Sequence, residues 1–259
     1  MDLSLVLAAC FISLVGLPHG ALDPVIARRV GLVRRPDQML TFLFGYSLLV
    51  ALVIGLWLLA PAACLSAFLL ASALHFGRDW QRVIGFGGWA YGALVLSLPL
   101  IVHSERVTEI FAFLVFDASP QVPVFILAAM GIAALILFAL DWRKLTPARA
   151  LELTALVVGA VVLEPLWFFV GYFCALHSPR HLRAEFQKIP ETERLIVFVV
   201  MLFITILTLA IAAFAGSHLE IHYEDLSVLM YQLIFIGLAA LTVPHMALLE
   251  WVGKHHGSD

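Results

Sequence analysis

Long apolar segments fill most of the chain and restrict the folds that are open to it. Nine can be distinguished, at residues 3–19, 38–59, 61–77, 83–103, 121–141, 148–163, 165–183, 192–215 and 225–250. Most of them approach the length of roughly 20 residues that an α-helix needs to cross a bilayer. Backbone polar groups inside a bilayer must be hydrogen-bonded within the protein, and a helix achieves this within one segment. The sequence therefore predicts an all-α, polytopic membrane bundle with about nine transmembrane segments.

Composition agrees with this interpretation. Of the 259 residues, 63% are hydrophobic and 13% are charged, whereas soluble domains have about 45–50% apolar and about 25% charged residues. The nine segments leave no stretch for a separate soluble domain, so residues 1–259 are expected to form a single transmembrane domain. The basic residues are distributed among the loops, which gives no support to nucleic-acid binding.

The distribution of basic residues predicts the orientation. If each segment crosses once, fourteen of the fifteen Lys and Arg residues fall on one side, and only Arg106 falls on the other. The positive-inside rule makes the first side cytoplasmic, with the N-terminus outside and the C-terminus inside. A single helix over 148–183 would place four basic residues outside, and Glu164-Pro165 favours a break there. We therefore expect a multi-pass protein of the cell inner membrane.

Five histidines from four different segments lie near the predicted inner ends of those segments: His19, His75, His177, His181 and His245. An imidazole inside a membrane is costly unless it is paired or bound to a ligand, so such residues are candidates for function. The alternative is that each makes a hydrogen bond in helix packing. Neutral imidazole suits iron, zinc and copper, and the three cysteines, Cys10, Cys64 and Cys174, form no CxxC pair and are expected to serve packing. The pattern favours one buried metal site.

The spacing of His177 and His181 places both rings on one face of a helix, about one turn apart. Pro179 lies between them and can end or kink that helix. A second repeated spacing is an aspartate four residues after a histidine, in His19 to Asp23 and in His75 to Asp79. Such a carboxylate can accept the second ring N–H of a ligating histidine. It can equally be a helix-end charge paired with Arg78 or Arg82.

Several classes of protein are excluded by what the segments lack. The three lysines, Lys144, Lys188 and Lys254, all lie outside the apolar segments, so no span offers an amine for a retinal Schiff base. The HxxHH boxes of membrane desaturases are absent, and no P-loop or Ser/His/Asp set stands out.

Four motifs follow one another along the chain: Gly16-Leu17-Pro18-His19-Gly20-Ala21-Leu22-Asp23, His75-Phe76-Gly77 with Asp79, His177-Ser178 with Arg180-His181, and Thr242-Val243-Pro244-His245-Met246. Together they resemble the motifs of the bacterio-opsin-related-protein-like family of membrane β-carotene 15,15′-dioxygenases. The resemblance extends over residues 16–246, almost the whole chain. Pro179 is a departure from the family's third motif.

The resemblance implies an enzyme that cleaves the central double bond of β-carotene with O2, giving two molecules of all-trans-retinal. It implies Fe²⁺ held by His19, His75, His177 and His181. His245 matches a family motif as well, and its role as a ligand, as a support behind the ligands or as part of the pocket wall stays open. Asp23 and Asp79 are expected to orient the ligands from behind or to line the pocket. The resemblance also implies contact with the lipid bilayer and a microbial rhodopsin as the acceptor of retinal. Two alternatives remain open from the residues alone. One is a non-catalytic membrane protein, such as a metal or proton transporter or an opsin-assembly factor, and the other is a metal oxygenase that acts on another polyene.

Overall fold

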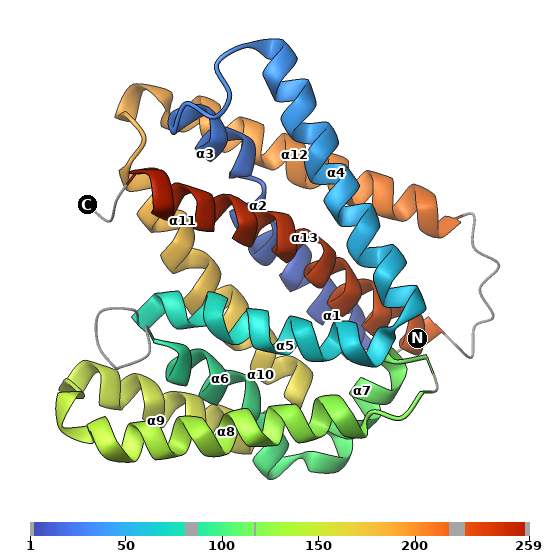
Figure 1. Cartoon of the computed structure of the whole chain (residues 1–259), viewed down its shortest axis with the longest axis vertical. Helices are drawn as coiled ribbons and strands as arrows, with labels where there is room; N and C mark the ends of the chain where they lie inside the picture. The colour runs from blue at the N-terminus through green and yellow to red at the C-terminus, as the bar shows by residue number, and fades with distance from the viewer. Residues whose placement is uncertain (1–2, 81–87, 117, 218–225, 257–259) are drawn as a thin grey trace. The chain divides into compact units, whose positions relative to one another are not determined.

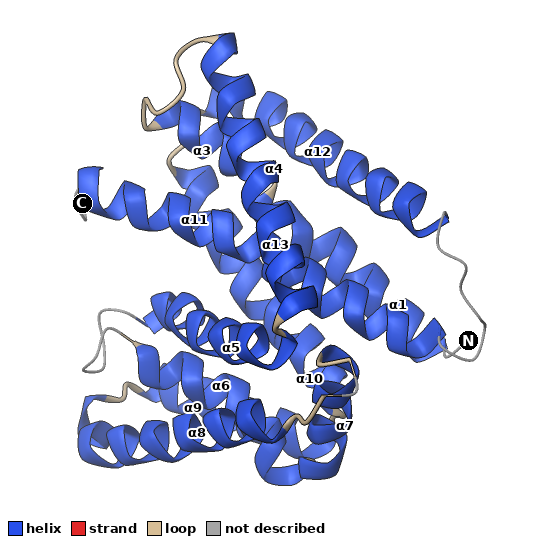
Figure 2. Cartoon of the chain, turned by 45° about the vertical axis from the view of Figure 1, so that its right-hand side comes forward, coloured by secondary structure: helices blue, strands red, loops and turns tan. Residues whose placement is uncertain are grey.

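The computed structural model describes residues 3–80, 88–116, 118–217 and 226–256, and every regular element in these ranges is a helix (Figure 2). The predicted all-α class is therefore confirmed for the described part of the chain. The chain divides into two compact units, one formed by Met1–Gly55 with Phe173–Asp259 and the other by Leu56–Tyr172. We call them the first and the second unit.

The first unit combines the two ends of the chain (Figure 1). Its helices are α1 (Leu3–Phe11), η1 (Ile12–Gly16), α2 (Leu17–Gly20), α3 (Asp23–Arg29), α4 (Pro36–Leu59), η4 (Phe173–His177), α11 (Ser178–Gln187), α12 (Glu191–Ser217) and α13 (Leu226–His256). The short helix α2 contacts α11, α12 and α13, and α1 runs beside α13 (Figure 1). A buried apolar cluster, including Leu22, Ile26, Met201 and Leu248, fixes the turn between α2 and α3 against α12 and α13.

The second unit is built on a close helix triplet. Its elements are α5 (Pro61–Gly77), η2 (Arg78–Trp80), α6 (Trp89–Val102), α7 (Ser104–Leu114), α8 (Gln121–Asp141), η3 (Trp142–Lys144), α9 (Pro147–Val162) and α10 (Pro165–Tyr172). Helix α6 packs on both α5 and α8 and is buried along nearly its whole length. Gly92 of α6 lies directly against the backbone carbonyl of Ala73 in α5, so the two helices approach without an intervening side chain.

All nine predicted apolar segments contain a helix. The predicted break at Glu164-Pro165 is present, since α9 ends at Val162 and α10 begins at Pro165. The start of the 83–103 segment falls within residues 81–87, outside the described residues, as does Arg82. Helix α7 was not predicted, because its apolar residues form only one stripe, Val107, Ile110, Phe111 and Leu114, all of which are buried.

Five helical segments in the described ranges are long and apolar enough to cross a membrane. They are Leu3–Arg29, Pro36–Leu59, Gln121–Lys144, Glu191–Ile211 and Leu226–His255, and Trp89–Val102 is a shorter apolar helix. Helices α4 and α12 expose large apolar side chains, among them Phe44, Leu48 and Phe203, as helices facing lipid do. The count of nine crossings and the orientation stay predictions.

Gly92 offers a test of the α5–α6 packing. A Cβ at this position would overlap backbone atoms of α5, which cannot move aside as a flexible side chain can. We expect Gly92→Ala to destabilise the protein by roughly 1–3 kcal/mol, the usual cost of overpacking, when thermal unfolding is followed by circular dichroism in detergent. Gly45→Ala in α4 is the control, because nothing lies within 4 Å of the added carbon. Equal unfolding temperatures for the two variants would contradict this packing.

Candidate metal centre

Four of the five predicted histidines meet inside the first unit. His19 comes from α2, His177 from η4, His181 from α11 and His245 from α13. The ring centroid of His19 lies 5.6 Å from that of His177, 5.5 Å from that of His181 and 5.2 Å from that of His245. The rings of His181 and His245 are also 5.2 Å apart. His19, His177 and His245 are buried. The convergence that was predicted from depth alone is thus present for these four side chains.

Three of these histidines lie in or shortly after two π-helical turns, each of which is followed two residues later by a proline. Pro18 and Pro179 have no N–H to donate to the carbonyl four residues earlier. Both of those earlier residues, Leu14 and Ala175, lie in the π-turns η1 and η4. In η1 the N–H of Leu17 bonds to the carbonyl of Ile12, five residues back, which is the π pattern. Pro179 therefore does not end the helix between His177 and His181, because the preceding turn has already widened.

The two π-turns are held against each other. The Ser178 hydroxyl, which is fully buried, donates to the carbonyl of Val15 at 2.7 Å. Gly16 lies so close to the Phe173 ring that a Cβ would overlap it. The Phe173 ring in turn packs edge-on against His19, with centroids 5.4 Å apart, and stacks on His177. These contacts fix the positions of His19 and His177 relative to each other.

The hydrogen bonds of two rings define which nitrogen of each carries a proton. Nδ1 of His19 donates to the carbonyl of Gly16 at 2.6 Å, since a carbonyl can only accept. Nδ1 of His245 lies 2.7 Å from Oδ1 of Asp23 and donates to it. Each ring therefore carries its proton on Nδ1 and its lone pair on Nε2, as in histidines that bind a metal through Nε2.

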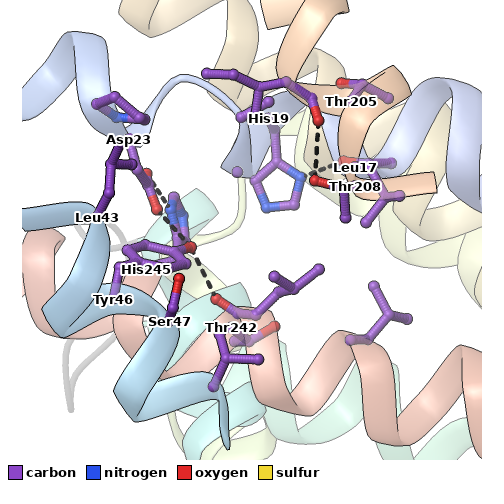
Figure 3. Close-up of a pocket in the computed structure, with 18 of the residues that line it drawn as sticks. Leu17, His19, Asp23, Leu43, Tyr46, Ser47, Thr205, Thr208, Thr242 and His245 are labelled. Atoms are coloured by element: carbon purple, nitrogen blue, oxygen red, sulfur yellow. Dashed lines mark hydrogen bonds and ion pairs between the residues drawn. The ribbon is translucent and has the colours of Figure 1, made fainter. Parts of the chain in front are cut away.

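Asp23 is completely buried and has two donors from other helices (Figure 3). Its Oδ1 accepts from His245, and its Oδ2 accepts from the Tyr46 hydroxyl of α4 at 3.0 Å. The sequence spacing suggested that Asp23 supports the histidine four residues earlier. The structure instead joins Asp23 to His245, 222 residues away, while His19 uses a backbone carbonyl.

His75 and Asp79 belong to the second unit. His75 is buried near the end of α5, beside the ring of Phe76 at 5.8 Å between centroids. Asp79 follows in η2, and its Oδ2 accepts a hydrogen bond from the Tyr172 hydroxyl at 3.2 Å. Asp79 thus meets a phenol that the sequence did not connect to it.

The donor set in the first unit fits a transition-metal ion. It consists of imidazoles, two of them with the lone pair assigned to Nε2 by their outer hydrogen bonds, and imidazole suits iron, copper and zinc. One ring nitrogen of His19 and one of His245 lie within 4.8 Å of each other, close enough to share an ion. Their outer partners, a backbone carbonyl and a carboxylate, are those that commonly support ligating histidines.

A cavity of about 300 Å³ opens beside His19 and His245 within the first unit (Figure 3). Its polar wall includes Asp23 and Tyr46. The other walls are largely aliphatic and come from α4, α12 and α13, with Leu43, Val50, Ile204, Ile211, Leu238 and Leu241 among the lining residues. The candidate metal centre is therefore bordered by a space that suits an apolar ligand.

Tyr46, Phe173 and Ser178 contribute to this site but were not predicted as site residues. Tyr46 is a polar group within an apolar segment, which is a weak signal, and nothing in the sequence links it to Asp23. Ser178 contributes through its hydrogen bond to Val15, a residue 163 positions away in sequence, and no local pattern predicts that contact.

A family model described as β-carotene 15,15′-dioxygenase matches residues 10–253 of the chain. The chain belongs to this family. A β-carotene 15,15′-dioxygenase of an uncultured marine bacterium is 30% identical over 270 residues, covering 97% of this chain and 94% of that protein. No solved structure matches the chain. The resemblance found in the motifs is confirmed, and membership of this family does not favour the alternative of a transporter or an assembly factor.

The contact between the π-turns can be tested at Ser178. Ser178→Ala removes a buried hydrogen bond and leaves the Val15 carbonyl without this donor. We expect a loss of about 1 kcal/mol in the free energy of unfolding, measured by denaturation in mixed micelles. In the control Thr41→Ala, the lost hydroxyl is exposed and bonds only to its own helix at Asp37, so stability should stay nearly constant. An equal effect of both substitutions would argue against the contact.

Proposed function

We propose that this member of the β-carotene 15,15′-dioxygenase family cleaves the central double bond of β-carotene with O2, giving two molecules of all-trans-retinal. The observation that carries the proposal is the cluster of histidines next to an apolar cavity, in a chain that matches the family over residues 10–253. The reaction balances with one O2 for each β-carotene, because one C=C bond is replaced by two C=O groups.

The proposed cofactor is Fe²⁺, and the proposed ligands are His19, His75, His177 and His181. Three of them share the cluster in the first unit, and His75 is included on its family motif alone. Bound ferrous iron would supply the one-electron chemistry that allows triplet O2 to react with a closed-shell polyene. The protein's part is to hold the rings: the Gly16 carbonyl fixes His19, and the Phe173 ring packs against His19 and His177.

The cavity supports a polyene as the substrate. Its aliphatic walls exclude water and offer dispersion contact to a conjugated chain, while His19 and His245 border it on one side. Cleavage at the centre, rather than at another double bond, would follow from the depth to which one arm of the substrate enters. Because β-carotene and retinal are lipid-soluble, the substrate can reach the protein through the bilayer and the product can leave by the same route.

The setting of this reaction is also a proposal. We place the chain in the cell inner membrane as a single multi-pass catalytic domain, with the N-terminus outside and the C-terminus in the cytoplasm. Support comes from the distribution of basic residues and from the apolar outer faces of α4 and α12. Retinal released into the bilayer would be taken up by a microbial rhodopsin.

The proposed activity is tested in a bacterial host that accumulates β-carotene. We expect the parent chain to bleach the orange pigment and to yield retinal or retinol on chromatography. His177→Ala and His181→Ala should lose at least 100-fold in product, since each removes a proposed ligand, while remaining in the membrane fraction. His255→Ala, in the exposed end of α13, should behave like the parent. Full activity in both cluster variants would refute the site, and unchanged β-carotene with metal-loaded parent protein would point to another polyene.

The role of the cavity is tested by filling it. Val50 lines the cavity from α4, whereas Leu48 of the same helix points outward and is 59% exposed. Val50→Trp should lower the cleavage rate at least tenfold without changing the metal content, and Leu48→Trp should change neither. Both quantities are read on the purified protein, by retinal formation and by elemental analysis. Equal cleavage by the two variants would place the substrate elsewhere.

A further inference from the structure

We propose that His245 is itself a ligand of the metal, held in place by Asp23 and Tyr46. This inference rests on the proposed function only in that the chain must bind a metal. It adds a fifth histidine to the four that the family resemblance implies, and it gives Asp23 a partner other than the one its spacing suggested.

The position of the ring proton on His245 shows which nitrogen can bind a metal. Asp23 accepts from Nδ1 of His245 at 2.7 Å, so Nδ1 carries a proton and Nε2 is the nitrogen left to bind a metal. Nε2 is buried, as is the whole His245 side chain. A carboxylate on the outer nitrogen also raises the electron-donating strength of the inner one, as it does in ligating histidines.

The neighbours of the His245 ring are other histidines of the cluster. The His245 ring contacts two of the proposed ligands, His19 and His181, each at 5.2 Å between centroids. A ring nitrogen of His245 lies within 4.8 Å of one of His19. His19 also has its lone pair on Nε2, because its Nδ1 is bonded to Gly16. Two imidazoles with ring nitrogens this close together offer the kind of donor atoms that one divalent transition-metal ion takes.

The burial of Asp23 also favours a cation next to His245. Asp23 has no exposed surface, and a buried carboxylate is costly even with two hydrogen-bond donors. A divalent cation on Nε2 of His245 would offset this charge through the ring. Tyr46 completes the arrangement, since its hydroxyl donates to the second oxygen of Asp23 and prevents the carboxylate from rotating away from His245.

The test measures metal binding apart from carotene cleavage. The purified full chain in detergent is stripped with a chelator and titrated with Co²⁺, whose visible absorption reports the number and type of ligands. We expect His245→Ala to weaken binding more than 100-fold and to change the absorption spectrum, with added imidazole restoring it. Asp23→Asn should weaken binding about 10–100-fold, the usual effect of altering the outer partner of a ligand, and Tyr46→Phe should weaken it less.

The control is His255→Ala, which removes a histidine from the same helix outside the cluster. The His255 ring is exposed and donates from Nδ1 to the Trp251 carbonyl, and its loss should leave Co²⁺ binding unchanged. Parental affinity and spectrum in His245→Ala would overturn the inference while leaving the proposed function intact. A parent chain that binds neither Co²⁺ nor Fe²⁺ would overturn both. If His245→Ala does not fold, Asp23→Asn decides, because parental affinity in that variant also overturns the inference.

Discussion

A carboxylate that is completely buried in an apolar bundle must be satisfied by donors from the protein, and Asp23 imposes this condition on the first unit. Its two oxygens are bonded to Tyr46 of α4 and His245 of α13, so one side chain at the start of α3 ties together segments from both ends of the chain. Removing either donor would leave a buried carboxylate with one of its hydrogen bonds lost. Asp23 therefore helps to hold α4 and α13 around the histidine cluster, together with the hydrogen bond from the Tyr46 hydroxyl to the Leu241 carbonyl.

Proline has an equally specific part in shaping the cluster. A proline inside a regular helix would remove a hydrogen bond and clash with the preceding turn. At Pro18 and Pro179 the preceding turn is π-helical, with hydrogen bonds to the carbonyl five residues back instead of four. The helix can therefore continue past the proline. The two π-turns contact each other, since Gly16 lies against the Phe173 ring and the Ser178 hydroxyl donates to the Val15 carbonyl. The same irregularity that interrupts the helices thus brings His19 and His177 together.

Sequence reasoning succeeded where the signal was local or repeated. Apolar segments predict helices because a membrane leaves few alternatives for the backbone, and the break before Pro165 follows from proline chemistry. The approach of four histidines followed from their shared depth. The partner of Asp23 could not be predicted in this way, since spacing reports neighbours on one helix, whereas the actual partner comes from another helix 222 residues away. Helix α7 was missed because its four buried apolar residues form a single stripe and not a continuous apolar segment.

The walls of the cavity suit an apolar ligand better than a polar one. Thr205 and Thr208 line it, but each hydroxyl donates to a carbonyl of its own helix, at Met201 and Ile204, and so presents mainly its methyl group. Asp23 and Tyr46 are likewise engaged with each other. The hydroxyls of Thr205, Thr208 and Tyr46 and the carboxylate of Asp23 are thus engaged in the protein's own hydrogen bonds, while Ser47 and Thr242 also line the space. A translocated ion would need exchangeable polar partners along a path, whereas the largely aliphatic walls of this cavity suit an apolar ligand.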